Sequence, residues 1–252
     1  MGTGTGSGDA AAAPRLTIGA GYARYRGPLT DGSCHRHAAF QVALAAGPDD
    51  RVAMVDRDGT RRRGTVLLVP PMVPHRLLPT ADLLTFFVDP HCAFADRLRR
   101  HCGPGVTVAP ELHGLGERDV RRAGARPSDE LDARLLAAMD ALSDRDVPMA
   151  DLAAAVGLSP QRLRALARDQ LGMPLVRWRL WLRLRRAAEA LRAGRHLADA
   201  AVAGGFADQA HFTRQMREMM GLTPAVVRTV LGPPGLLSGA VRDVHREGAG
   251  ER

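Results

Sequence analysis

An internal repeat in the last third of this 252-residue chain constrains the fold most strongly. The two copies read DLAAAVGLSPQRLRALARDQLGMP, from Asp151, and DAAVAGGFADQAHFTRQMREMMGLTP, from Asp199. An Asp, a Gly and an apolar residue recur 48 positions apart, and after one inserted residue a second apolar residue and a second Gly recur 49 apart. A repeat of this kind indicates one structural unit that is used twice.

Each copy is predicted to form a helix, a tight turn and a second helix. In the first copy, Gly157 permits the positive φ of a sharp turn, Ser159 is a natural N-cap and Pro160 suits the first helical position. Asp208 caps the corresponding helix of the second copy. Apolar periodicity predicts that each second helix buries one face. The residues left exposed are Gln161, Arg162, Arg164, Ala165 and Arg168, and then Gln209, Ala210, His211, Thr213 and Arg214.

An exposed helix face of this composition suits the major groove of double-stranded DNA, because Gln can pair with adenine and Arg with guanine through two hydrogen bonds each. The stretch between the copies, LVRWRLWLRLRRAAEALRAG, is apolar on two faces, which predicts a linker helix wedged between two partners. It would hold the two reading helices about one DNA turn apart, roughly 34 Å. Trp178 and Trp181 are expected in the core rather than stacked on bases.

Charge distribution favours the same partner. The net charge is +8, and residues 144–230 contribute +6 of it, with 14 Arg against 8 acidic residues. This excess indicates a polyanion partner, although charge alone also fits a generic basic surface. Four arginines of the C-terminal third fit either phosphate contacts or internal salt bridges: Arg177, Arg179, Arg183 and Arg195. No apolar run approaches ~20 residues, so no membrane span is expected and a cytoplasmic, nucleoid-associated protein is predicted.

The rest of the chain predicts a second domain and therefore an α+β fold. Short apolar or alternating runs such as FQVALAA and GTVLLVP, punctuated by Gly and Pro, predict strands over residues 15–90, arranged as a small barrel or a sandwich. Residues 91–143 read as a helical connector that pairs two chains into a homodimer. The DNA-binding domain is expected over 144–232, with tails at 1–14 and 233–252.

Residues 147–230 resemble the DNA-binding domain of the AraC/XylS family of bacterial transcription regulators. The motifs that carry the resemblance are LAAAVGLSPQRL, LRLRRAAEAL, and GFADQAHFTRQM followed by GLTP. Ala167 and Met216 depart from the aromatic residues frequent in the family, and Ala165 and Ala210 replace longer polar side chains. The resemblance implies a sequence-specific regulator, by family habit an activator that acts with RNA polymerase. Its implied base-contacting positions are Gln161, Arg164, Ala165, Gln209, Ala210, Thr213 and Arg214.

Residues 30–90 resemble a cupin, a β-barrel with two characteristic motifs. The first motif is represented by His35, His37, Gln41 and Gly47. The second is represented by Gly64, Pro70, Met72 and His75. All three histidine positions of the cupin pattern are filled, whereas a Gln stands where an acid is usual and Met72 where Gly is usual. The fold expected from both resemblances is a cupin-like β-barrel followed by an all-α domain with two helix-turn-helix motifs and a linker helix.

Two interpretations of the histidines stay open. His35, His37, Gln41 and His75 can line a metal-free pocket for a small-molecule effector, as regulatory cupins usually do. Alternatively, His35, His37 and His75 can hold a divalent metal, Fe, Zn or Mn. A metal-dependent cupin enzyme fused to a DNA-binding domain is the competing function, and Gln41 in place of the acid argues against it. The sequence therefore predicts a regulator controlled by an effector, not an enzyme.

Overall fold

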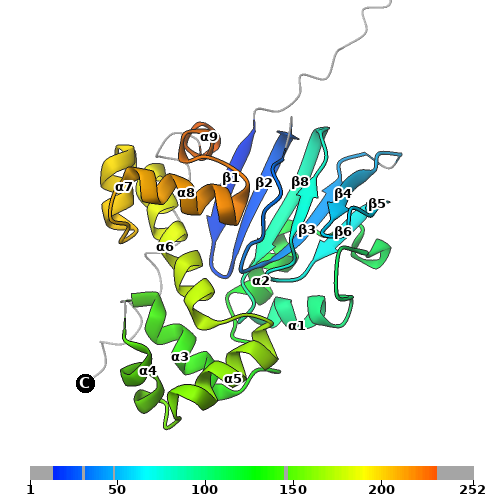
Figure 1. Cartoon of the computed structure of the whole chain (residues 1–252). Helices are drawn as coiled ribbons and strands as arrows, with labels where there is room; N and C mark the ends of the chain where they lie inside the picture. Colours follow the sequence, from blue (N-terminus) through cyan, green and yellow to red (C-terminus); the bar gives the residue numbers. More distant parts are fainter. Residues whose placement is uncertain (1–13, 30–31, 48, 145–146, 232–252) are drawn as a thin grey trace, which may run out of the picture.

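The computed structural model describes residues 14–29, 32–47, 49–144 and 147–231, so the predicted tails lie outside the described residues, except for residue 14. The chain folds into a sheet-rich N-terminal domain and a helical C-terminal domain (Figure 1). The predicted α+β class with two domains is confirmed. Within the described residues, no helix is both long and apolar enough to cross a bilayer.

The strands of the described residues form two antiparallel sheets. The larger has six strands, in the order β1 (Arg15–Gly19), β2 (Tyr22–Leu29), β8 (Thr80–Val88), β3 (Phe40–Ala45), β6 (Val66–Val69) and β9 (Thr107–Val108). The smaller has three, in the order β5 (Arg61–Gly64), β4 (Val52–Asp56) and β7 (His75–Leu77). Apolar side chains of both sheets, among them Met54 and Leu83, pack between them as one core.

Of the two arrangements that the sequence left open, the described strands form the sandwich of two sheets, and the expected cupin-like barrel is not closed. A barrel would need the outer strand β1 to pair onward. Instead β1 packs against helix α9 (Pro224–Val230), as Figure 1 shows. Helix α9 thus packs on the outer strand of the six-stranded sheet.

Both faces of the six-stranded sheet are covered, which explains why its central strands are almost continuously apolar. One face packs on three short helices, α1 (Ala93–Arg99), the 3-10 helix η1 (Pro110–Leu112) and α2 (Glu117–Gly124). Phe40, Val42 and Leu44 point to that side. The opposite face is shared by the three-stranded sheet and the helical domain.

The helical domain contains α3 (Ala133–Asp144), α4 (Met149–Ala155), α5 (Pro160–Leu171), α6 (Leu175–Arg192), α7 (Leu197–Ala203), α8 (Gln209–Met220) and α9. Helix α3 packs on α4, α5 and α6, whereas α1 and α2 pack on the sheet, so residues 91–143 divide between the two domains. The predicted pairing of two chains through this segment stays a prediction. Helix α6 is the predicted linker between the two helix-turn-helix units, and its Trp178 and Trp181 are buried, at 0% and 4% exposure.

Candidate functional site

The two second helices of the repeat, α5 and α8, begin as the sequence predicts. Ser159 Oγ accepts a hydrogen bond from the backbone N–H of Arg162 at 3.2 Å, and Asp208 Oδ1 accepts one from that of His211 at 2.6 Å. Gly172 and Gly221 end the two helices in the left-handed conformation, with φ of 68° each. Such a C-cap favours Gly, which has no Cβ to strain the backbone. We call α5 and α8 the recognition helices.

Most predicted DNA-contacting side chains are exposed on these helices. Ala165 and Ala210 add no polar group to the surface. His211 and Thr213 are half-buried and already have local partners. The ring of His211 packs edge-on to Phe206, and Thr213 Oγ1 donates to the carbonyl of Gln209 at 2.8 Å. The exposed members are Gln161, Arg162, Arg164, Ala165, Arg168, Gln209, Ala210 and Arg214.

Three of the four arginines with an undecided role make contacts inside the protein. Arg177 pairs with Glu218 at 2.9 Å, and Arg179 donates to the carbonyl of Val147. Arg183 lies 4.7 Å from the ring centroid of Phe206, and its Nε donates to the carbonyl of Gly204 at 3.1 Å. These contacts favour the structural alternative over phosphate binding for the three side chains. Arg195, the fourth, is exposed.

The four residues predicted for the effector pocket lie together in the N-terminal domain. His35 and His75 face each other across a two-hydrogen-bond bridge, with both N···O distances 3.0 Å. The three imidazole centroids are 4.6–5.7 Å apart, and the side chains of His35, His37 and His75 are all buried. Each ring offers a nitrogen within 4.8 Å of the others. We call these residues the histidine cluster.

Hydrogen bonds fix how the rings are turned. Nδ1 of His35, His37 and His75 lies 2.8, 2.8 and 2.9 Å from the backbone carbonyls of Ser33, Ala39 and Val73. A carbonyl only accepts, so each Nδ1 carries the proton and each Nε2 has a lone pair when the ring is neutral. Gln41 Oε1 lies 3.1 Å from Nε2 of His37 and 2.7 Å from that of His75.

Burial keeps the cluster neutral. Burial and repulsion by His35 lower the pKa of His37 to about 4. Burial, followed by repulsion from the two neighbouring rings, sets the pKa of His75 well below its ordinary value, and burial lowers that of His35. Desolvation disfavours the charged imidazolium in each case. The cluster therefore presents three neutral imidazoles at neutral pH.

The histidine cluster lies beside the linker helix. The ring of Trp181, on α6, is 6.3 Å from that of His37 and 6.4 Å from that of Phe87. Trp181 Nε1 donates to Asp89 Oδ1 at 2.8 Å. Arg185, one turn further along α6, pairs with the same carboxylate. We call these three polar residues, Asp89, Trp181 and Arg185, the interdomain latch.

Sequence reasoning missed the latch. Trp181 and Arg185 are four residues apart on one helix and so share a face. That face could be recognised, but Asp89 lies 92 residues earlier in the chain and nothing in its surroundings marks a partner. Arg185 also donates to the carbonyl of Gly19 at 2.9 Å, which ties the turn between β1 and β2 to α6.

An apolar cavity of about 290 Å³ opens next to the histidine cluster, between the sheet and the end of α8. On the sheet side it reaches His35, Gln41 and Thr85 as polar groups. On the helical side it is closed by the loop after α8 and by α9, with Val226 and Val227 among the lining residues. The cavity therefore contacts both domains.

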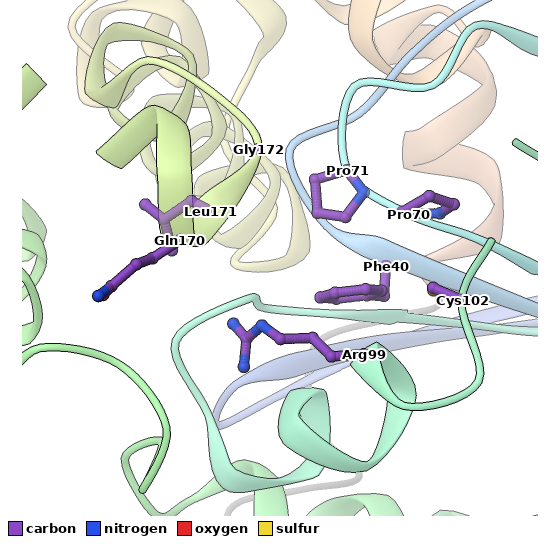
Figure 2. A pocket seen from close by; sticks show the side chains of 8 residues that line it. All are labelled: Phe40, Pro70, Pro71, Arg99, Cys102, Gln170, Leu171 and Gly172. Atoms are coloured by element: carbon purple, nitrogen blue, oxygen red, sulfur yellow. The ribbon is translucent and has the colours of Figure 1, made fainter. Parts of the chain in front are cut away.

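A smaller cavity of about 180 Å³ lies under the other recognition helix. Figure 2 shows Phe40, Pro70 and Pro71 of the N-terminal domain on one side and the end of α5, at Leu171 and Gly172, on the other. Pro71 is followed by Met72. Among the described residues, Met72 is the only one other than Gly with a positive φ, which is 63°. That conformation explains why Gly is usual at this position of the cupin motif.

Comparisons with known proteins give the fold and the domain type. Residues 152–229 match the family described as "Helix-turn-helix domain". ToxT from Vibrio cholerae O395 superimposes with a TM-score of 0.54 at 10% identity, covering 84% of this chain and 99% of that one. ToxT from strain SCE256 with bound unsaturated fatty acid gives 0.55 at 12% identity, over 83% and 95%.

A regulator with an AraC-type DNA-binding domain, from Chromobacterium violaceum, is 27% identical over 40% of this chain and 95% of that one, with a TM-score of 0.38. A search of curated proteins finds no match. The ToxT structures span both domains described above, at identities that bear on the fold alone. Residues 152–229 are therefore a helix-turn-helix domain, in a chain with the two-domain fold of ToxT.

Proposed function

We propose that the protein is a sequence-specific transcription regulator whose DNA affinity is set by an effector bound next to the histidine cluster. The observation that carries this proposal is the pair of capped recognition helices, α5 and α8, which present exposed Gln and Arg side chains from the two ends of one linker helix. The +6 charge of residues 144–230 supports a DNA partner. The cluster then has a regulatory and not a catalytic role.

Selection of bound sequences from a random duplex library, with the full-length protein, tests this function. The expected result is a bipartite site whose halves lie about one helical turn apart, roughly 34 Å, because each recognition helix reads one half. Enrichment of a single short site would mean that only one helix reads bases. No enrichment at any salt concentration would overturn the proposal.

Arg164→Ala and Arg214→Ala are each expected to lower discrimination at one base position by ~1–3 kcal/mol, the typical worth of a bidentate base contact. The two variants should lose discrimination in different halves of the selected site. Competition binding with single-base variants of that site measures the effect. Arg62→Ala, an exposed arginine on β5, is the matched control and should leave the pattern unchanged. Equal losses on specific and random DNA would instead make these residues phosphate contacts.

The effector proposed here is a compact and mainly apolar molecule in the 290 Å³ cavity, with a polar end that hydrogen-bonds His35, Gln41 or Thr85. The ToxT relatives include structures with an unsaturated fatty acid and with (E)-4-(8-methylnaphthalen-1-yl)but-3-enoic acid, which makes such acids the first probes. Val227→Phe is expected to fill the cavity and abolish the thermal shift caused by a bound acid, with DNA binding retained. A shift that persists in this variant would place the effector elsewhere.

Activation, contact with RNA polymerase and pairing of two chains complete the proposal. They rest on the resemblance to AraC/XylS regulators and on the two-part DNA site expected for them. The protein would act at the nucleoid, where its DNA partner lies. Transcription from the selected site in a purified system, with and without the protein, tests the direction of regulation.

A further inference from the structure

We propose that His35, His37 and His75 bind a divalent transition-metal ion, Zn(II) or Fe(II), and that the bound ion fixes the two segments on which the recognition helices rest. The second half of this proposal rests on the proposed function, whereas the first half does not. Three neutral imidazoles with one amide oxygen beside them are a donor set that suits these ions. Without a carboxylate, the set suits the harder Mn(II) less well.

The orientation of the rings supports the metal site. Ligating histidines in proteins almost always donate their other ring N–H to a carbonyl, a carboxylate or water, which holds the free nitrogen toward the metal. Here all three Nδ1 atoms donate to backbone carbonyls, at 2.8–2.9 Å. The donated protons leave every Nε2 with its lone pair, and a ligating nitrogen of each ring lies within 4.8 Å of the others.

Gln41 provides a second argument. Its Oε1 faces the Nε2 lone pairs of His37 and His75 at 3.1 and 2.7 Å, which places acceptor against acceptor. A cation in the cluster removes this conflict. The alternative is that the amide is turned over, so that its NH2 group donates to both rings. Its oxygen would then face Thr85 Oγ1 at 3.3 Å, and the Thr85 hydroxyl would have to turn from the carbonyl of Val42, to which it donates at 3.2 Å. The turned amide leaves no role for a metal, and the experiment below separates the two arrangements.

The segment that carries His35 and His37 touches the end of recognition helix α8. The backbone N–H of Arg36 donates to the carbonyl of Glu218 at 3.4 Å, and Ser33 Oγ donates to that of Gly221 at 3.4 Å. The approach is close, because a Cβ added at Gly221 would lie 2.8 Å from His35 Nδ1. A shift of the histidine segment therefore reaches the C-cap of α8 directly.

The other side of the cluster touches recognition helix α5. The backbone N–H of Met72 donates to the carbonyl of His37 at 2.8 Å, and this bond helps hold Met72 at its unfavourable φ. Pro70 and Pro71, just before it, face Leu171 and Gly172 across the smaller cavity (Figure 2). His75 lies three residues after Met72. An ion that draws the three rings together thus constrains both supports, and with them the relative placement of α5 and α8.

Metal binding is tested on the full-length protein without DNA. Chelator-treated protein is titrated with Co(II), followed by its visible absorption, and then with Zn(II), followed by displacement of that absorption. We expect one ion per chain and a rise in melting temperature. His37→Gln and His75→Gln should each weaken binding by more than the roughly 10–100-fold that loss of a supporting group costs.

His113→Gln, which alters an exposed histidine outside the cluster, is the control and should bind as the wild type does. Gln41→Glu restores a carboxylate beside the rings and should tighten binding. Failure of the folded wild type to bind either ion would overturn the metal site and favour the turned amide of Gln41. Binding that survives both histidine substitutions would also overturn it.

Coupling to DNA is tested next, with the site recovered from the random library. Zn(II) should change the affinity for that site by roughly 5–150-fold, the usual range of coupling between two sites, and the site should change the Zn(II) affinity by the same factor. The change should vanish in His37→Gln. Stoichiometric metal binding with unchanged DNA affinity would overturn the coupling alone. A failed library selection with intact metal binding would count against the proposed function and leave the metal site standing.

Discussion

Replacement of Asp89 by Ala is expected to lower the free energy of unfolding by about 3–5 kcal/mol, the usual cost of breaking a buried ion pair by removal of one partner. The Asp89 carboxylate is almost fully buried, and it accepts hydrogen bonds from Trp181 Nε1 and from Arg185. The substitution leaves the indole N–H without its acceptor, and it leaves the mostly buried guanidinium of Arg185 with the carbonyl of Gly19 but without its carboxylate. Urea unfolding, followed by the fluorescence of the tryptophans, measures the loss.

Asp82→Ala is the matched control. Asp82 also pairs with an arginine, Arg26, at 3.1 Å, but about two fifths of its side chain and half of that of Arg26 are exposed. Exposed pairs contribute roughly 0–1 kcal/mol, because water screens the charges. Asp89→Asn is a second, milder variant, since its amide oxygen can still accept from Trp181. Losses of equal size at Asp82 and Asp89 would contradict the importance assigned to the latch.

The interdomain latch joins the two domains beside the histidine cluster. Asp89 directly follows strand β8, whose Phe87 packs against both His37 and Trp181. Packed rings thus connect the cluster to the linker helix, and backbone contacts connect it to the segments beside α5 and α8. A ligand shifts the equilibrium between two arrangements of the domains only if it binds one arrangement more tightly than the other. This interface is where a ligand can contact both domains.

The helical domain could be predicted from the sequence almost in full, because its determinants are local. Ser159 and Asp208 cap the helices that they precede, and Gly157 takes the positive φ, 67°, that the turn needs. The buried tryptophans of α6 follow from a helix that is apolar on two faces. Exposure of Arg164 and Arg214 follows from the same periodicity, since the apolar positions between them are required for the core.

The N-terminal domain was predictable in part. The spacing of His35, His37 and His75 predicted that they converge, and they do. The open, sandwich-like arrangement of the two sheets was not predictable, since it depends on pairing between strands far apart in the sequence, such as β2 with β8. The interdomain latch could not be predicted from the sequence for the same reason. Asp89 next to Pro90 reads as a strand end, and its partners lie on a helix of the other domain.

Acidification is the second change with a large expected effect. His35, His37, His75 and His91 all have lowered pKa values in the folded protein, chiefly because they are buried. For His37 the pKa falls from 6.5 to about 4, so the unfolded chain binds a proton between these values and the folded protein does not. The contribution of His37 to the free energy of unfolding is therefore fully present above pH 6.5 and is lost as the pH falls toward 4. Over this pH range His37 alone lowers the free energy of unfolding by about 3 kcal/mol, at 1.36 kcal/mol per pKa unit.

Unfolding free energies measured from pH 4.5 to 8, with a chelator present, test this prediction. Each of the four histidines contributes a slope of up to about 1.4 kcal/mol per pH unit in the acid range, while between pH 7 and 8 they contribute none. His37→Gln should remove about one proton from the acid slope, since Gln does not titrate. An acid slope that is the same in this variant and in the wild type would mean that the folded cluster takes up its proton at ordinary pH values. In that case the rings would face Gln41 as donors, and the lone pairs that a metal ion requires would not be available.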